Sequence, residues 1–245
     1  MTHEERLAIA AELARRIVDT YGDAVRAVFI TSSTARGLDR EHSDLEISAV
    51  VRDGVEIEEK SYLYRGVLLE IDYPQETPLL QKARRRGGRW PVEADGYRSR
   101  LVLFERDGWL RRLGAAVAES DAQGHTRALQ HAATMLIESR DKLRNARLEG
   151  DRLDLRVQAS WTADAAANLV LLLNGRYMIT TRWFYRQAFE CPHQPADFRR
   201  RIELSVGMVP ATEEQIADAA ESLTDDLVAM VTARGVAVES AELIV

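Results

Sequence analysis

The hydrophobic pattern of this chain changes near residue 120, and that change limits the folds available to it. Before this point, short apolar runs rich in β-branched residues alternate with short helical patterns. After it, long helical patterns dominate, over residues 125–148, 156–174, 181–190 and 212–234. Strands grouped in one half and helices in the other are typical of an α+β protein. We therefore predict a mixed-sheet α/β domain over residues 1–120 and a helical domain over residues 121–245.

The first half carries the signals of individual helices and strands. Leu7, Ala11 and Ile17 recur at helical spacing, and Thr2 stands where an N-cap belongs, which predicts a helix over residues 3–20. The other predicted elements are strands over 24–30, 44–51 and 100–104, a hairpin over 62–73, helices over 76–86 and 108–118, and a terminal strand over 236–245.

The charge and the cysteine content exclude several classes of protein. The formal net charge of −6 argues against a nucleic-acid-binding protein, which usually carries a basic face. No apolar run approaches the roughly 20 residues of a membrane-spanning helix, and the polar residues 1–6 do not resemble a signal peptide. The single cysteine, Cys191, cannot form an internal disulfide. We therefore expect a cytoplasmic protein without a membrane or nucleic-acid partner.

Three carboxylates lie on two predicted strands. Asp44 and Glu46 are two residues apart, so their side chains point to the same face of a sheet. Glu70, in the second arm of the predicted hairpin, can supply a third carboxylate. Hard divalent cations prefer oxygen ligands of this kind. The pattern predicts a metal site formed by these three residues, with Asp72 as a neighbour of the site rather than a ligand.

A turn of small residues, 31–35, stands between the first strand and these carboxylates. Ser33 and nearby backbone N–H groups can bind the terminal phosphates of a nucleotide, and Arg36 can contact a phosphate oxygen. Phosphoryl transfer needs positioned groups and neutralised charge more than covalent catalysis, and two metal ions supply both. The combined pattern indicates metal-dependent phosphoryl transfer.

Several short segments carry a family resemblance. The serine turn followed by Asp44-Leu45-Glu46 is similar to the signature of the nucleotidyltransferase superfamily, which has Gly-Ser, a spacer and Asp-x-Asp/Glu. Beyond it, the order and spacing of further segments resemble the kanamycin (aminoglycoside 4′) nucleotidyltransferase family. These segments are Tyr21-Gly22-Asp23-Ala24-Val25, Arg89-Trp90-Pro91-Val92, Asp107-Gly108-Trp109-Leu110, Lys142-Leu143-Arg144-Asn145-Ala146-Arg147 and Tyr177-Met178-Ile179-Thr180-Thr181.

The resemblance implies an enzyme that moves a nucleoside monophosphate from a nucleoside triphosphate, with ATP as the expected donor, to a hydroxyl of an aminoglycoside-type small molecule. Pyrophosphate is the second product. It implies two magnesium ions on Asp44, Glu46 and Glu70, and triphosphate contacts from Ser33 and Arg36. It also implies a homodimer whose active sites lie between subunits. The helical half would contribute the general base, Glu138, and a lysine that reaches the nucleotide phosphates, Lys142.

One residue departs from the family pattern. Ser32 stands where the family has a glycine, a residue that lets the backbone approach a phosphate closely. A serine fits this position if its backbone angles are ordinary and its side chain turns away.

Alternative interpretations remain open for the same residues. Asp44 and Glu46 could belong to a solvated strand face. Glu138 and Lys142, four residues apart, could be an ordinary ion pair on a helix surface. The aromatic residues Trp161, Tyr177, Trp183 and Phe184 are interpreted as packing helices together.

The function also has alternatives. One is the same chemistry on another acceptor: a different antibiotic, a tRNA end or a protein hydroxyl. A second is a catalytically inactive nucleotide-binding module, for which Ser32 is the main argument. The third is a structural helical protein with an incidental acidic strand. The sequence leaves open which hydroxyl is modified, which base the nucleotide carries and whether antibiotic resistance is the native role.

Overall fold

A computed structural model describes residues 1–240 of the chain, which form two compact units. The first unit contains Met1–Arg86 and Ala94–Gln123, and the second contains Gly87–Glu93 and the chain from Gly124 onward. The predicted boundary at residue 120 differs from this division in two ways. The division falls later because the helix that closes the first unit continues to Ala122, and Gly87–Glu93 groups with the helical unit despite its place in the sequence.

The first unit is built on a mixed sheet, as predicted. Within the described residues its strands are β1 (Val25–Ile30), β2 (Leu45–Val51), β3 (Lys60–Tyr64), β4 (Val67–Asp72) and β5 (Leu101–Glu105), in the order β3-β4-β2-β1-β5. The pair β2–β4 is parallel, and the other neighbouring pairs are antiparallel. The α+β class is therefore confirmed, and so is the hairpin formed by β3 and β4.

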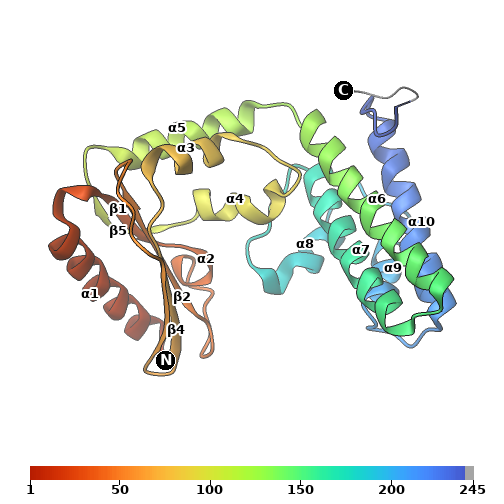
Figure 1. Cartoon of the computed structure of the whole chain (residues 1–245), viewed down its shortest axis with the longest axis horizontal. Coiled ribbons are helices and arrows are strands. Elements are labelled where there is room, and N and C mark those ends of the chain that lie inside the picture. Colours follow the sequence, from red (N-terminus) through yellow and green to blue (C-terminus); the bar gives the residue numbers. More distant parts are fainter. Residues whose placement is uncertain (241–245) are drawn as a thin grey trace. The chain divides into compact units, whose positions relative to one another are not determined.

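Helices cover both faces of this sheet (Figure 1). One face packs on α1 (His3–Tyr21), through a core that includes Ile17, Ile47 and Leu69. The other face packs on α3 (Glu76–Arg84) and α5 (Trp109–Ala122), where the Trp109 indole stacks on the Phe29 ring. Because successive side chains of β2 alternate between these faces, its even-numbered residues lie on the α3 and α5 side.

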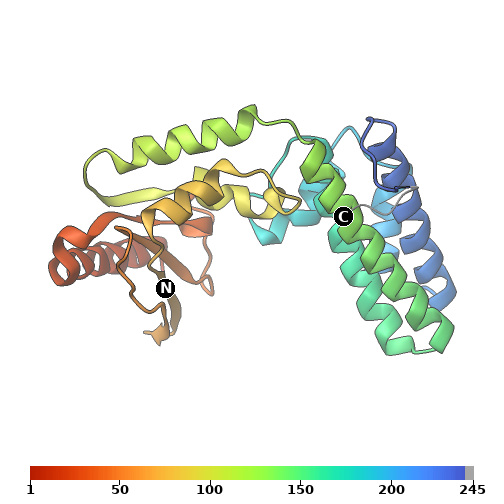
Figure 2. The same cartoon turned by 45° about the horizontal axis from the view of Figure 1, so that its top comes forward.

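The second unit is a helical bundle. Its long helices are α6 (Thr126–Glu149), α7 (Arg152–Leu173) and α10 (Glu213–Thr232), which run alongside one another (Figure 2). Gly150 ends α6 in the left-handed conformation, and Asp151 caps α7 by accepting from the backbone N–H groups of Leu153 and Asp154. Two short helices, α8 (Phe184–Phe189) and α9 (Phe198–Ser205), complete the unit.

The remaining helical elements are short: α2 (Ser32–Ala35), α4 (Trp90–Arg98) and the 3₁₀ turns Gly22–Ala24 and Thr181–Trp183. The hydrophobic pattern does not predict α4, which contains Pro91 and Gly96, or α9, which contains three consecutive arginines. Residues 236–240 form no strand, and the rest of the predicted terminal strand lies outside the described residues. Every helix over residues 1–240 is too short or too polar to span a lipid bilayer.

The segment Gly87–Glu93 is bound to the helical unit by specific contacts. The amide Nδ2 of Asn168 donates to the Gly88 carbonyl oxygen at 2.7 Å, and the Met178 N–H donates to the Pro91 carbonyl oxygen at 2.7 Å. The Trp90 and Tyr177 rings meet edge to face with their centroids 5.9 Å apart. Two of the family-like segments, which are far apart in the sequence, therefore pack against each other in this unit.

Candidate active site

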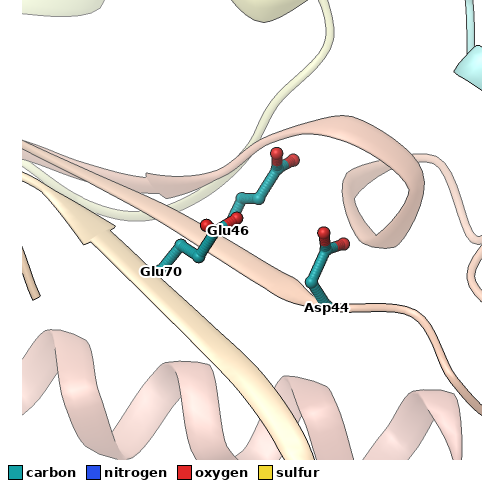
Figure 3. A group of neighbouring side chains, drawn as sticks. All are labelled: Asp44, Glu46 and Glu70. Carbon is teal, nitrogen blue, oxygen red and sulfur yellow. The ribbon is translucent and has the colours of Figure 1, made fainter. Parts of the chain in front are cut away.

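The strand register brings the predicted metal ligands together. In the parallel pair β2–β4, Glu46 is the direct partner of Glu70, and Asp44 immediately precedes β2. One carboxylate oxygen from each of the three residues lies within 4.8 Å of the other two. Figure 3 shows Glu46 and Glu70 on neighbouring strands and Asp44 just before the strand that carries Glu46. Such spacing allows one or two divalent cations to be shared between them.

The electrostatic surroundings of Glu46 favour a cation. Its Oε2 atom is buried and has no hydrogen-bond partner among the described residues. Burial raises the pKa of Glu46, and the charges of Asp44, Glu70 and Asp72 add to this, while a hydrogen bond from Ser32 lowers it. A buried carboxylate among like charges is stabilised by a bound cation. The residues present therefore fit the magnesium that the family resemblance implies.

Asp72 is arranged differently from these three carboxylates. It lies on the same face of β4 as Glu70, but its Oδ2 accepts a hydrogen bond from the Ser48 hydroxyl at 2.9 Å. Burial also raises its pKa, and the Ser48 bond opposes that effect. This local partner supports the interpretation of Asp72 as a neighbour of the site.

The turn after β1 adjoins the same site. Its Thr31 N–H donates to the Glu46 carbonyl oxygen at 3.2 Å, which joins the turn to β2, and Ser33 lies in the short helix α2. Ser32 has a φ of 57°, so the condition of ordinary backbone angles is not met. The chain keeps the left-handed conformation that glycine adopts easily, at a cost of about 1–2 kcal/mol for a residue with a Cβ atom.

Arg36, the second predicted phosphate ligand, forms an ion pair in the first unit. Its Nε donates to Asp95 Oδ1 at 3.2 Å, and its Nη2 bonds the same oxygen. Asp95 is almost fully buried. The pair fixes the direction of the guanidinium group, and its contact with a phosphate stays a prediction.

A buried arginine holds the loop that leads into Asp44. Arg6, on α1, is 1% exposed and pairs with Asp39, which is equally buried, at 3.0 Å. Its guanidinium also donates to four carbonyl oxygens, those of Met1, Arg40, Glu41 and Ser43, at 2.6–3.0 Å. The contacts of Arg6 therefore fix the loop that precedes Asp44, the first predicted metal ligand.

Arg6→Met is expected to lower the free energy of unfolding by about 3–5 kcal/mol, because Asp39 would remain buried with only the His3 ring as a side-chain partner. Chemical denaturation at neutral pH measures this change. Arg15→Met on the same helix is the matched control: Arg15 is exposed and pairs with Glu12 and Asp19, so its loss should cost less than about 1 kcal/mol. Equal effects of the two variants would contradict this role of Arg6.

The helical unit contains the other predicted site residues. Lys142 Nζ donates to Glu138 Oε1 at 2.8 Å, and both side chains are about half exposed. They line a cavity of about 710 Å³ formed by α6, α7, the segment from Met178 to Tyr185 and the loop at Gly88. The ordinary surface-pair interpretation does not account for this position beside a cavity, although it accounts for the geometry of the pair.

The same cavity corrects one interpretation and adds residues that the sequence did not indicate. Trp161 does not pack helices together: its side chain is 54% exposed and lines the cavity. Asp164, Asn168 and Tyr185 line it as well. Asp164 and Asn168 are four residues apart on α7, so they share one helix face, whereas Tyr185 comes from α8. That spacing is the only feature of the sequence that could have indicated Asp164 and Asn168.

Comparisons with known proteins agree with these features. A family model described as KNTase C-terminal domain matches residues 110–237. Two relatives, each called aminoglycoside nucleotidyltransferase (4'), come from Staphylococcus aureus and from a Bacillus species. Each is 29% identical over 175 residues, which cover 69% of this chain and 68% of the relative.

A solved structure has a similar fold. It is a nucleotidyltransferase-like protein from Exiguobacterium sibiricum, with a TM-score of 0.56 and 16% sequence identity, and the match covers 90% of this chain and 74% of that one. At this identity the likeness concerns the fold alone.

Proposed function

Because the chain belongs to the KNTase C-terminal domain family, we propose that it is an aminoglycoside nucleotidyltransferase. The reaction would transfer a nucleoside monophosphate from a nucleoside triphosphate, with ATP as the expected donor, to an aminoglycoside hydroxyl. The single observation that carries the proposal is the cluster of Asp44, Glu46 and Glu70 on one face of the sheet. The names of the two similar proteins support the acceptor class.

Each site residue has a defined task in this reaction. Asp44, Glu46 and Glu70 would hold two magnesium ions, which neutralise charge on the phosphates when bound. Ser33, Arg36 and Lys142 would contact the phosphates of the nucleotide. Glu138 would take the proton of the acceptor hydroxyl as that oxygen attacks the α-phosphorus. The new oxygen–phosphorus bond forms as the bond to pyrophosphate breaks.

We further propose that the enzyme is a homodimer with shared sites. The family resemblance supports this arrangement. The acceptor must reach carboxylates of the first unit and Glu138 of the second, and two subunits can supply these groups to one site. The demand for a nucleoside triphosphate supports a place in the cytoplasm.

The test is a transfer assay with magnesium, each of the common nucleoside triphosphates and a panel of aminoglycosides. We expect pyrophosphate release and an acceptor whose mass rises by one nucleoside monophosphate, both prevented by EDTA. Magnesium-dependent nucleotide binding without any product would instead support the inactive module. A product with another hydroxyl compound, but with no aminoglycoside, would support the alternative acceptors.

A further inference from the structure

The cavity in the helical unit contains a carboxylate held by a neutral partner. The Tyr185 hydroxyl donates to Asp164 Oδ1 at 2.6 Å, and both residues line the cavity. Burial raises the pKa of Tyr185, as does the neighbouring Asp164, so the phenol remains a hydrogen-bond donor at neutral pH. No lysine, arginine or histidine over residues 1–240 forms an ion pair with Asp164. Its negative charge is thus oriented without being neutralised.

A second acceptor lies one helical turn further along α7. Asn168 Nδ2 donates to the Gly88 carbonyl oxygen, which fixes the orientation of the amide. The Oδ1 atom of Asn168 is then left buried with no hydrogen-bond donor among the described residues. Such an atom gains from a ligand that brings a donor.

Gly88 makes this arrangement possible. A Cβ atom at residue 88 would come within 2.9 Å of the Ala132 backbone nitrogen and of His131 Nδ1. The loop can therefore lie directly against α6, with its carbonyl group at Asn168, only when residue 88 lacks a side chain.

Apolar side chains complete the lining. Trp161 is 54% exposed and Met135 is 44% exposed, although both are large and apolar. An aromatic face of this kind attracts the C–H face of a sugar ring and, more strongly, an ammonium group. The cationic side chains on the lining are both paired with carboxylates, Lys142 with Glu138 at 2.8 Å and Arg89 with Glu93 at 4.0 Å.

We infer that Asp164, Asn168 and Trp161 form a recognition site for a protonated amino group of the acceptor. An ammonium group would donate to the Asp164 carboxylate and to Asn168 Oδ1, with the Trp161 ring beside it. The inference rests on the proposed function and deepens it: these residues select an amine-bearing acceptor, whereas Glu138 activates its hydroxyl. Asp164 is thus a specificity-determining residue with no part in the chemical step.

Asp164→Asn tests the site, because the amide keeps the shape of the side chain and can still accept from Tyr185. The KM for kanamycin should rise roughly 10- to 100-fold, as expected for the loss of a charged hydrogen bond. The kcat value and the KM for the nucleotide should stay within about threefold. Glu149→Gln is the matched control, because it removes one negative charge from the end of α6, outside the cavity lining.

Acceptors that are N-acetylated at one amine identify the group that is recognised. Acetylation of that amine should raise the KM of the wild-type enzyme by a similar factor and should add little in Asp164→Asn. If every acetylation costs the variant as much as the wild type, the site does not bind an amine. An unchanged KM for kanamycin, or an equal loss of nucleotide affinity, would also overturn the inference.

Calorimetry separates this inference from the proposed function. Kanamycin is titrated into the wild type and into Asp164→Asn, each with magnesium and a non-reactive nucleotide analogue. Weaker binding to the variant supports the amine site even if the wild type transfers nothing, in which case the proposed function alone fails. Equal binding to the two proteins, or no binding to either, overturns the amine site, whatever the transfer assay gives.

Discussion

Asp44→Asn is expected to lower the rate of nucleotidyl transfer by at least roughly 10³-fold, because metal stabilisation of transition-state charge is worth several kcal/mol and each 1.4 kcal/mol is about tenfold in rate. The change removes one of the three carboxylates of the cluster formed with Glu46 and Glu70. Magnesium-dependent binding of the nucleotide should weaken as well. Turnover and the thermal midpoint with ATP, measured with and without magnesium, are the two readouts.

The fold should tolerate this substitution. Burial and the charges of neighbouring carboxylates raise the pKa of Glu46, so the ionised cluster opposes folding when no cation is bound. Removing one charge should leave the thermal midpoint of the nucleotide-free protein unchanged or raise it. The wild type alone should gain stability from magnesium and ATP together, because a ligand that binds the folded state shifts the midpoint upward.

Asp72→Asn is the matched control for Asp44→Asn. Asp72 is a carboxylate on the same sheet face, but Ser48 binds it and it lies outside the cluster. We expect Asp72→Asn to retain transfer and its magnesium dependence. Wild-type turnover in Asp44→Asn, or an equal loss in both variants, would contradict the assignment of the metal ligands.

The sheet and its carboxylates could be predicted from the sequence because strand geometry is simple. A period of two places Asp44 and Glu46 on one face, and a short hairpin places β4 beside β3. The pairing of β4 with β2, on its other side, could not be predicted in this way. The parallel pairing that makes Glu70 the partner of Glu46 joins strands that are not consecutive in the chain, and no local pattern specifies their register.

Contacts between residues that are distant in the sequence could not be predicted. Arg6 belongs to an amphipathic helix, and nothing near it in the sequence indicates that its partners are residues 39–43. The same holds for Asp95 with Arg36 and for Asn168 with Gly88. Each contact links segments that only the tertiary fold brings together.

One error of interpretation has a local physical cause. Trp161 was assigned to packing because large aromatic residues on helices are usually buried. Its neighbours Thr162 and Ala163 are indeed buried, but the face of α7 that carries Trp161 borders the cavity. At Ser32 the backbone takes a positive φ, so the serine does not meet the condition of ordinary backbone angles under which it would fit the position of the family's glycine.

Glu138→Gln is expected to lower turnover by roughly 10²–10⁴-fold, which is the usual contribution of a general base. Binding of the nucleotide and of the acceptor should persist, because glutamine keeps the size of the side chain. The stability of the protein should change little, since an exposed pair such as Glu138–Lys142 contributes at most about 1 kcal/mol.

A second helical pair provides the control for this variant. Glu12 also forms an i,i+4 pair with an arginine, Arg16, at 2.6 Å on the surface of α1. Glu12→Gln should leave turnover at the wild-type level. If Glu138→Gln does the same, Glu138 and Lys142 are an ordinary surface pair and the general base lies elsewhere.

Mixing the two inactive proteins tests whether each site is shared between subunits. Asp44→Asn and Glu138→Gln homodimers should both be inactive. After random exchange, about half of the dimers are mixed. In a mixed dimer with shared sites, one site carries both substitutions and the other carries neither. Activity should then return to about a quarter of the wild-type value. If each site lies within one subunit, every site stays defective and no activity returns. Mass spectrometry verifies that the subunits have exchanged. Absence of transfer activity in such a mixture rules out the shared site, while leaving the proposed roles of Asp44 and Glu138 intact.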